Sequence, residues 1–316
     1  MRERSSTMIA TLLWLLVLAG LATAVIWIGP DRLIQPWQML SWPAILLALG
    51  LMSLSYWLRA LRIQRYFLTE LRGQFWPCLR LTTWHILLNN LLPMRSGELS
   101  FPVLMQRYFG LPATRSVPVL LWFRLLDLQV LVLIGLGIAI LGSGLSELWL
   151  LPVGLLLPAP LVVYWLRVPL KNWLIRRPAR AWKAPLLAGI DSLPQHPRAL
   201  LAALGWTLAN WIVKVGTLAW LLSQWLPVSI PGALAGAIGG DLTTILPIHA
   251  PGGFGTFEAG VILALQPFTG HLPAIAAAAL NLHLFLLSSS VLASVWALWI
   301  RIPRPTATQN ARERFE

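Results

Sequence analysis

The chain has 316 residues, of which 57% are hydrophobic and only 11% are charged, and its mean hydropathy is +0.71. Soluble domains carry about 25% charged residues, so this composition excludes a soluble globule, a disordered chain and a fibrous repeat. Because apolar runs long enough to cross a bilayer recur along the chain, the net charge of +13 indicates membrane orientation and contact with anionic lipid rather than nucleic-acid binding.

The first apolar run is Met8–Ile28, which follows Arg2 and Arg4. Its segment Ala22–Ala24 imitates the small-residue cleavage site of a signal peptide. The run continues past that site and is longer than a usual signal-peptide core. We therefore expect a retained first membrane span.

Length and hydropathy predict five further full spans. These are Trp42–Leu61, Val117–Leu141, Leu148–Leu166, Ala199–Leu222 and Ala274–Ile300. Two more apolar stretches, Cys78–Tyr108 and Pro231–Pro267, are interrupted in the middle by polar, Pro and Gly residues. The sequence thus predicts an all-α membrane helix bundle with six full spans and two re-entrant broken hairpins.

The distribution of basic residues predicts the orientation of this bundle. If each broken stretch enters and leaves on the same side, twenty of the twenty-four Lys and Arg residues face the cytoplasm, with Arg59 and Arg62 among them. Such a bias places both termini in the cytoplasm and the chain in the inner membrane. If one broken stretch were instead a complete span, the basic segment at residues 167–198 would face outward.

That basic segment interleaves its cations with Trp173, Trp182 and several leucines. Two interpretations remain open for it. It is either a solvated loop that sets the topology or an amphipathic segment that lies on anionic lipid headgroups.

The two interruptions follow the same pattern. The first runs from Asn89 and Asn90 through Leu-Pro to Gly97 and Glu98, and the second runs from Asp241 through Leu-Pro to Gly252, Gly253 and Glu258. Pro removes a backbone donor and Gly admits unusual dihedral angles, so both stretches are suited to unwinding. Hairpins that enter from opposite sides are typical of an inverted-topology repeat, whose breaks mark the transport site. The alternative is two unrelated loops.

The predicted organisation is a single membrane domain over residues 1–316. Its first repeat covers about 42–141 and its second about 199–300. A linking span and the basic loop at 148–198 join the repeats, and 301–316 forms a cytoplasmic tail. Gly232, Gly236 and Gly240 have the spacing of closely packed helices.

Charged residues inside the spans are the main functional signal, because each costs about 2.5–3.5 kcal/mol at the centre of a membrane helix. Arg124 and Asp127 are three residues apart, a spacing at which two side chains can pair on one face of a helix. Arg95 and Glu98 have the same spacing. Lys214 needs a more distant partner, for which Asp241 and Glu258 are the candidates. Such pairs could instead only pin helices together. The predicted transport-site residues are Asn89, Asn90, Arg95, Glu98, Arg124, Asp127, Asn210, Lys214, Asp241, Gly252, Gly253 and Glu258.

Signals for enzymatic chemistry are weak. The single cysteine, Cys78, excludes a cysteine-based metal cluster, and no histidine pair has metal-ligand spacing. The glycines near Gly252 lack the strand and the Gly-Lys-Ser/Thr of a nucleotide loop. We therefore expect no catalytic residue, no cofactor and no nucleic-acid partner.

Three segments resemble the lysylphosphatidylglycerol synthase transmembrane-domain family, namely Asn90–Leu99, Phe123–Asp127 and Pro251–Glu258. The resemblance implies a flippase-like protein that moves an aminoacyl phospholipid or a polyprenyl-phosphate-linked sugar between leaflets. The chain departs from the family pattern at Phe123, where an acidic residue is usual, and at Ser100-Phe101, where Arg is often found. Because no soluble synthase domain follows, we expect this chain alone not to be an aminoacyl-lipid synthase.

Three functions therefore compete. The first is a lipid flippase or scramblase. The second is a non-catalytic membrane partner of a glycosyltransferase or lipid synthase. The third is an intramembrane enzyme that uses Glu98, Asp127 or Glu258 as general acid or base, although no catalytic motif supports it.

Overall fold

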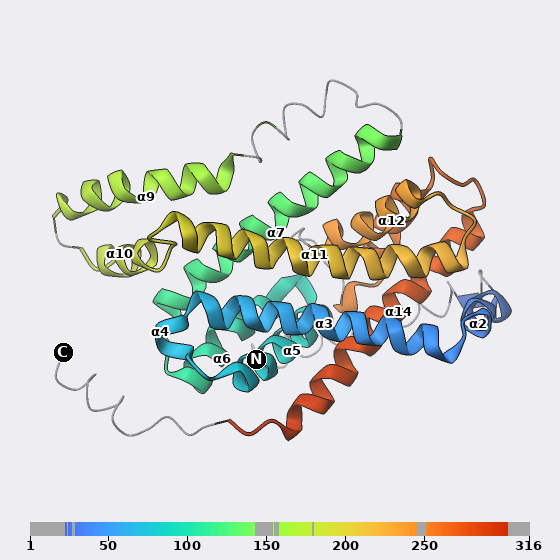
Figure 1. The fold of residues 1–316 in the computed structure, drawn as a ribbon, viewed down its shortest axis with the longest axis horizontal. Helices are drawn as coiled ribbons and strands as arrows, with labels where there is room; N and C mark the ends of the chain where they lie inside the picture. The colour runs from blue at the N-terminus through green and yellow to red at the C-terminus, as the bar shows by residue number, and fades with distance from the viewer. Residues whose placement is uncertain are drawn as a thin grey trace, which may run out of the picture.

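The computed structural model describes residues 29–142, 158–178, 180–244 and 251–302, together with Thr23, Val25, Ile26 and Gly154. Within these ranges the chain is helical and has no strand. Four helices are long and apolar enough to cross a membrane, so the protein is a multi-pass membrane protein (Figure 1). They are α3 (Trp42–Tyr66), α7 (Ala113–Gly142), α11 (Pro197–Trp225) and α14 (Leu272–Trp296), which η4 (Ala297–Trp299) extends.

These four helices correspond to four of the predicted full spans. α3, α7 and α11 extend past their predicted limits, whereas α14 begins two residues before its predicted limit and, with η4, ends at Trp299, one residue before it. The fifth, predicted at Leu148–Leu166, is only partly described: α9 (Ala159–Ile175) begins inside it and continues into the basic segment. The predicted first span lies almost entirely outside the described residues. The six-span count therefore stays a prediction.

A short helix that the sequence did not predict, α2 (Pro30–Met39), precedes α3. It begins with a proline at its first position, where a missing N–H costs nothing. Its Trp37 indole donates a 3.0 Å hydrogen bond to Asn281 of α14, and the Asn281 amide donates to the Leu33 carbonyl at 3.1 Å. These bonds attach α2 to α14.

Both predicted interruptions are present. The first stretch divides into α5 (Phe75–Leu91), η1 (Pro93–Leu99) and α6 (Ser100–Phe109). The second divides into α12 (Ile230–Thr243), η3 (Pro251–Gly253) and α13 (Thr256–Leu265), while residues 245–250 lie outside the described part. The broken segments η1 and η3 contact each other, so the described parts of the two breaks lie side by side. Membrane re-entry and inverted symmetry stay predictions.

Glycine is required at the turns of both breaks. A Cβ at Gly97 would lie 2.4 Å from the Asn89 Cα, so only glycine lets η1 fold back onto α5. In the second break Gly252, Gly253 and Gly255 have φ angles of 69°, 76° and 83°, a region that side chains other than glycine rarely adopt. The two turns thus depend on glycines that are already visible in the sequence.

Small residues also set the distance between α12 and α13. Cβ atoms at Gly239 and Gly260 would each lie within 2.4 Å of the other glycine's carbonyl oxygen. A Cβ at Gly236 or Gly240 would likewise overlap side chains of Leu265 or Phe257. The glycine-mediated packing that the sequence predicts is therefore confirmed, and its closest point involves two further residues, Gly239 and Gly260.

We expect Gly260→Ala to lower the free energy of unfolding by about 1–3 kcal/mol, because backbone rather than a flexible side chain blocks the added methyl group. Gly205→Ala is the matched control, since a Cβ at this position of α11 meets nothing within 4 Å. Unfolding of the purified protein in detergent measures both. Equal stability of the two variants would contradict the close backbone contact.

The basic segment at residues 167–198 is partly helical, and its first part is the end of α9. It continues into α10 (Lys183–Asp191), which packs against α7 and α9. Trp173 and Trp182 are 50% and 44% exposed, and the Arg177 guanidinium lies 4.5 Å from the Trp173 ring centroid. Exposed indoles next to cations are typical of a segment at a membrane interface.

The predicted orientation can be tested by placing single cysteines at two exposed positions that the structure describes, in a chain whose own cysteine is removed by Cys78→Ala. Thr69 follows α3 and Ser229 precedes α12. We expect a membrane-impermeant thiol reagent added to intact cells to label Ser229→Cys, and to label Thr69→Cys only after permeabilisation. The reverse pattern would invert the orientation.

Candidate functional site

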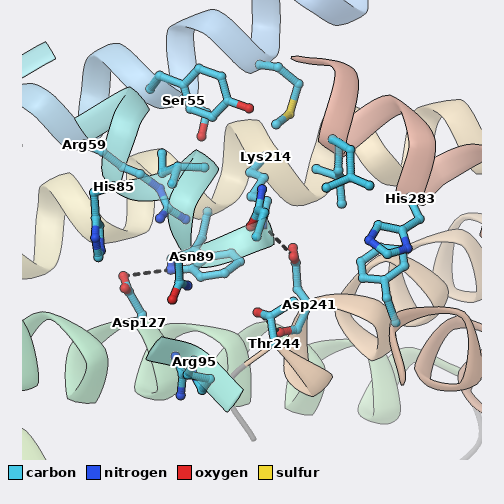
Figure 2. Close-up of a pocket in the computed structure, with 18 of the residues that line it drawn as sticks. Ser55, Arg59, His85, Asn89, Arg95, Asp127, Lys214, Asp241, Thr244 and His283 are labelled. Atoms are coloured by element: carbon cyan, nitrogen blue, oxygen red, sulfur yellow. Dashed lines mark hydrogen bonds and ion pairs between the residues drawn. The ribbon is translucent and has the colours of Figure 1, made fainter. Parts of the chain in front are cut away.

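A polar cavity lies between the two breaks, enclosed by α3, α5, α7, α11, α12 and α14 (Figure 2). Its volume is about 70 Å³, which is room for roughly five water molecules. The charged residues that line it are Arg59, His85, Arg95, Arg124, Asp127, Lys214, Asp241 and His283. Such a concentration of ionisable groups between apolar helices marks the candidate site.

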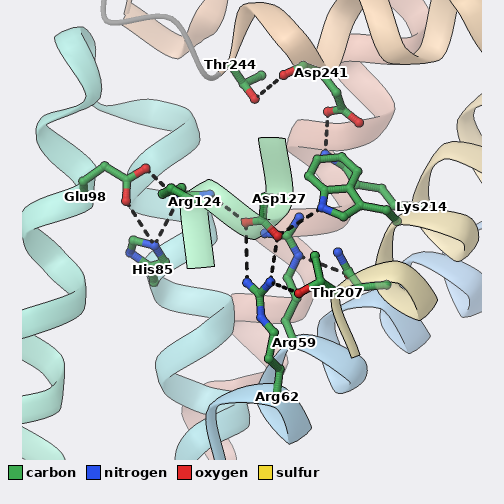
Figure 3. Close-up of polar contacts among 12 residues, drawn as sticks. Arg59, Arg62, His85, Glu98, Arg124, Asp127, Thr207, Lys214, Asp241 and Thr244 are labelled. Carbon is green, nitrogen blue, oxygen red and sulfur yellow. Dashed lines mark hydrogen bonds and ion pairs between the residues drawn. The ribbon is translucent and has the colours of Figure 1, made fainter. Parts of the chain in front are cut away.

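The most buried ion pair joins α3 to α7. Arg62 Nη1 donates to Asp127 Oδ1 at 2.7 Å and to the Thr207 hydroxyl of α11 at 2.9 Å (Figure 3). The Arg62 guanidinium also lies 4.3 Å from the centroid of the Phe123 ring. Arg62 is 5% exposed and Asp127 1% exposed, so the pair is removed from solvent and held by three helices.

Trp211 of α11 connects this pair to the rest of the site. Its indole N–H donates to Asp127 Oδ1 at 3.0 Å. Its ring lies near two cations, with the Arg59 guanidinium 5.5 Å and the Lys214 ammonium 5.0 Å from the centroid. Attraction between a cation and an aromatic face holds both side chains at the cavity wall.

A second ion pair joins α11 to α12. Lys214 Nζ contacts Asp241 Oδ1 at 2.5 Å, and Asp241 is fully buried (Figure 2). This confirms Asp241 as the partner that the sequence left open. The other carboxylate oxygen, Asp241 Oδ2, is buried without a hydrogen-bond partner in the described part of the chain, as is Asn89 Oδ1.

Glu98 contacts the basic side chains near the first break. Its Oε1 contacts Arg95 Nη2 at 2.9 Å. The same oxygen contacts Arg124 Nη2 at 2.6 Å, while Oε2 lies 3.7 Å from His85 Nε2 (Figure 3). One carboxylate therefore faces two arginines. The expected Arg95–Glu98 pair is confirmed. The expected Arg124–Asp127 pair is long at 3.6 Å, because Arg62 takes the nearer position on Asp127.

Arg59 has no carboxylate partner among the described residues. Its Nε donates to Asn210 Oδ1 at 3.2 Å, an atom that also accepts from the Ser55 hydroxyl at 2.7 Å. Arg59 is one of the residues that line the cavity. We define the central cluster as five cations (Arg59, Arg62, Arg95, Arg124, Lys214) and three carboxylates (Glu98, Asp127, Asp241). The cluster thus carries an excess of positive charge.

The structure brings most of the predicted site residues together. Those that line the cavity are Asn89, Asn90, Arg95, Arg124, Asp127, Lys214, Asp241 and Gly252. Glu98 and Asn210 contact residues of the wall. Glu258 lies apart from the ion pairs: its Oε2 accepts from the Gly255 N–H at 2.7 Å and its Oε1 contacts His283 Nδ1 at 2.7 Å. Glu258 therefore caps the N-terminus of α13.

Sequence reasoning missed several members of the site, including Trp211. Arg59 and Arg62 were assigned to cytoplasmic segments, but α3 continues to Tyr66 and both side chains reach the central cluster. The signal was their offset of three residues beside Tyr56, which places one polar face at the end of a span. His283 of α14, which also lines the cavity, contacts Glu258.

Metal binding finds no support in the described part of the chain, where no three His, Cys, Asp or Glu side chains are grouped suitably. Comparison with known proteins gave one result. The family described as the lysylphosphatidylglycerol synthase TM region matches residues 11–294. Neither a curated protein nor a solved structure matches the chain significantly.

Proposed function

This chain belongs to the family of the lysylphosphatidylglycerol synthase transmembrane region, and we propose that it moves a lipid with a phosphate-containing headgroup between leaflets. The family ties the protein to membrane lipid metabolism. Its name describes the membrane region of a lipid-modifying protein, whereas the role that we propose here is transport rather than catalysis.

The observation that carries the proposal is the uncompensated positive charge of the central cluster. Desolvated charges are costly unless paired, so five cations facing three carboxylates favour an anion in the cavity. A lipid phosphate supplies that charge. Its first contact would be Arg59, whose guanidinium faces no carboxylate among the described residues.

The unpartnered acceptors suggest what else the headgroup carries. Asn89 Oδ1 and Asp241 Oδ2 are hydrogen-bond acceptors, and no donor in the described part of the chain bonds to either of them. Hydroxyl or amino groups next to the phosphate would satisfy them, as in a glycerol, sugar or aminoacyl headgroup. The substrate is thus an aminoacyl phospholipid, its unmodified anionic precursor or a polyprenyl-phosphate-linked sugar.

Movement of such a headgroup requires the helices to separate. A cavity with room for roughly five water molecules is too small for a complete headgroup. The contacts that would separate are those between η1 and η3, because these segments join the two hairpins. The half-helices that begin after each break would add backbone donors toward the phosphate.

The same proposal places the protein in the inner membrane with both termini in the cytoplasm. The exposed Trp173, Trp182 and neighbouring cations would then contact anionic lipid at the cytoplasmic surface. A glycosyltransferase or lipid synthase is the partner class that would supply or use the transported lipid.

The test is reconstitution of the purified chain in liposomes that contain a headgroup-labelled phosphatidylglycerol. We expect labelled lipid to exchange between leaflets faster than in protein-free liposomes, and faster than labelled phosphatidylcholine. If neither phospholipids nor polyprenyl phosphates move faster than in empty liposomes, with or without an ion gradient, the role as a non-catalytic partner becomes the better account.

A further inference from the structure

An apolar groove lies on the outside of the bundle between α3, α5 and α14. Its volume is about 390 Å³, larger than that of the polar cavity. The lining residues are Leu49, Ser53, Tyr56, Trp57, Leu79, Thr83, Ser289, Leu292, Ala293 and Trp296. Several of them, such as Trp57 and Leu292, are 41% and 56% exposed, so the groove opens toward the hydrocarbon of the bilayer.

The groove and the polar cavity share a wall. Tyr56 lines both, and its hydroxyl lies 2.9 Å from the Ser289 hydroxyl, so this hydrogen bond between α3 and α14 is part of the wall between the two spaces. Tyr56 is 5% exposed and Ser289 4%, which makes this contact a buried partition. An apolar space that adjoins a cationic one matches a molecule with a chain attached to an anion.

Tryptophans at one end of the groove indicate its level in the membrane. At one end the Trp76 ring packs against those of Trp57 and Trp296, with ring centroids 5.6 and 6.1 Å apart, respectively. Indoles gather at the level of lipid headgroups. At this end Arg80 donates a 2.6 Å hydrogen bond to the Ile300 carbonyl, next to Arg301. The groove therefore lies in the half of the membrane next to these basic residues.

We propose that this groove holds one acyl chain of an anionic phospholipid whose phosphate occupies the polar cavity, with Tyr56 and Ser289 as the partition that the glycerol region passes. The inference rests on the proposed function, because it assumes a lipid phosphate at the central cluster. It adds the path of the tail: the chain stays in contact with the bilayer while the headgroup is inside the bundle.

The test maps where an acyl chain contacts the protein. The full chain is reconstituted with phosphatidylglycerol that carries a diazirine in one acyl chain, irradiated, digested and analysed by mass spectrometry. Leu292 lines the groove, whereas Val295, on the same helix and 53% exposed, does not. We expect severalfold more label at Leu292 than at Val295, decreasing as unlabelled phosphatidylglycerol increases. Equal labelling, or labelling that only a polyprenyl phosphate displaces, would overturn the assignment.

A pair of variants provides the second measurement. Ala293→Trp fills the groove, and Val295→Trp adds the same side chain to the neighbouring lipid-facing surface. We expect Ala293→Trp to lose both the Leu292 label and lipid exchange, with Ala293→Leu intermediate, and Val295→Trp to keep both. Exchange by the wild type without preferential groove labelling would reject the groove alone. Saturable groove labelling without exchange of any lipid would reject the transport function and leave the groove as a binding site.

Discussion

Replacing Arg59 with glutamine should reduce the exchange of phosphatidylglycerol between leaflets by roughly 10- to 100-fold, the equivalent of one hydrogen bond to a charged group. The reason is that Arg59 is the cavity cation without a carboxylate among the described residues, so its charge is available to a headgroup. Exchange is measured in liposomes at equal protein content. The loss should be smaller for zwitterionic phosphatidylethanolamine than for phosphatidylglycerol.

The matched control is Arg65→Gln. Arg65 is on the same helix but is exposed and does not line the polar cavity. We expect this variant to keep exchange, and both variants to keep the stability of the wild type, since neither leaves a buried carboxylate unpaired. Unchanged exchange in Arg59→Gln would remove the main support for an anionic substrate.

The second large effect concerns stability. Asp127→Asn should lower the free energy of unfolding by about 3–5 kcal/mol, because it leaves the buried Arg62 guanidinium without its carboxylate. The measurement is unfolding of the purified protein in detergent. The variant should also fail to exchange lipid, although the pair itself is a structural element of the wall.

Two controls separate burial from charge. Asp191→Asn makes the same change in the exposed Lys171–Asp191 pair, whose side chains are 41% and 50% exposed, and should cost less than about 1 kcal/mol. The double variant Arg62→Met/Asp127→Leu should recover most of the lost stability, because an apolar pair of similar volume can replace a buried ion pair. Equal losses at Asp127 and Asp191 would contradict the buried position of the Arg62–Asp127 pair.

The membrane class and the main long helices could be derived from the sequence because hydropathy and length act locally. A run such as Trp42–Leu61 must bury its backbone polar groups in a helix whatever its neighbours do. The two breaks were equally visible, since Pro93 fixes its own φ angle and removes a backbone donor, while glycines such as Gly97 and Gly252 allow close contacts or positive φ angles. The family resemblance was confirmed by the match to residues 11–294.

The partners of the charges were decided only by the tertiary structure. Spacing along one helix brought Arg124 near Asp127, but Arg62 from α3 and Trp211 from α11 hold the shorter contacts with that carboxylate. Local spacing cannot show which of several cations reaches a carboxylate first, because that depends on how helices far apart in the chain cross. The same crossing joins Lys214 to Asp241, removes Glu258 from the cluster and leaves Arg59 facing the cavity without a carboxylate partner among the described residues.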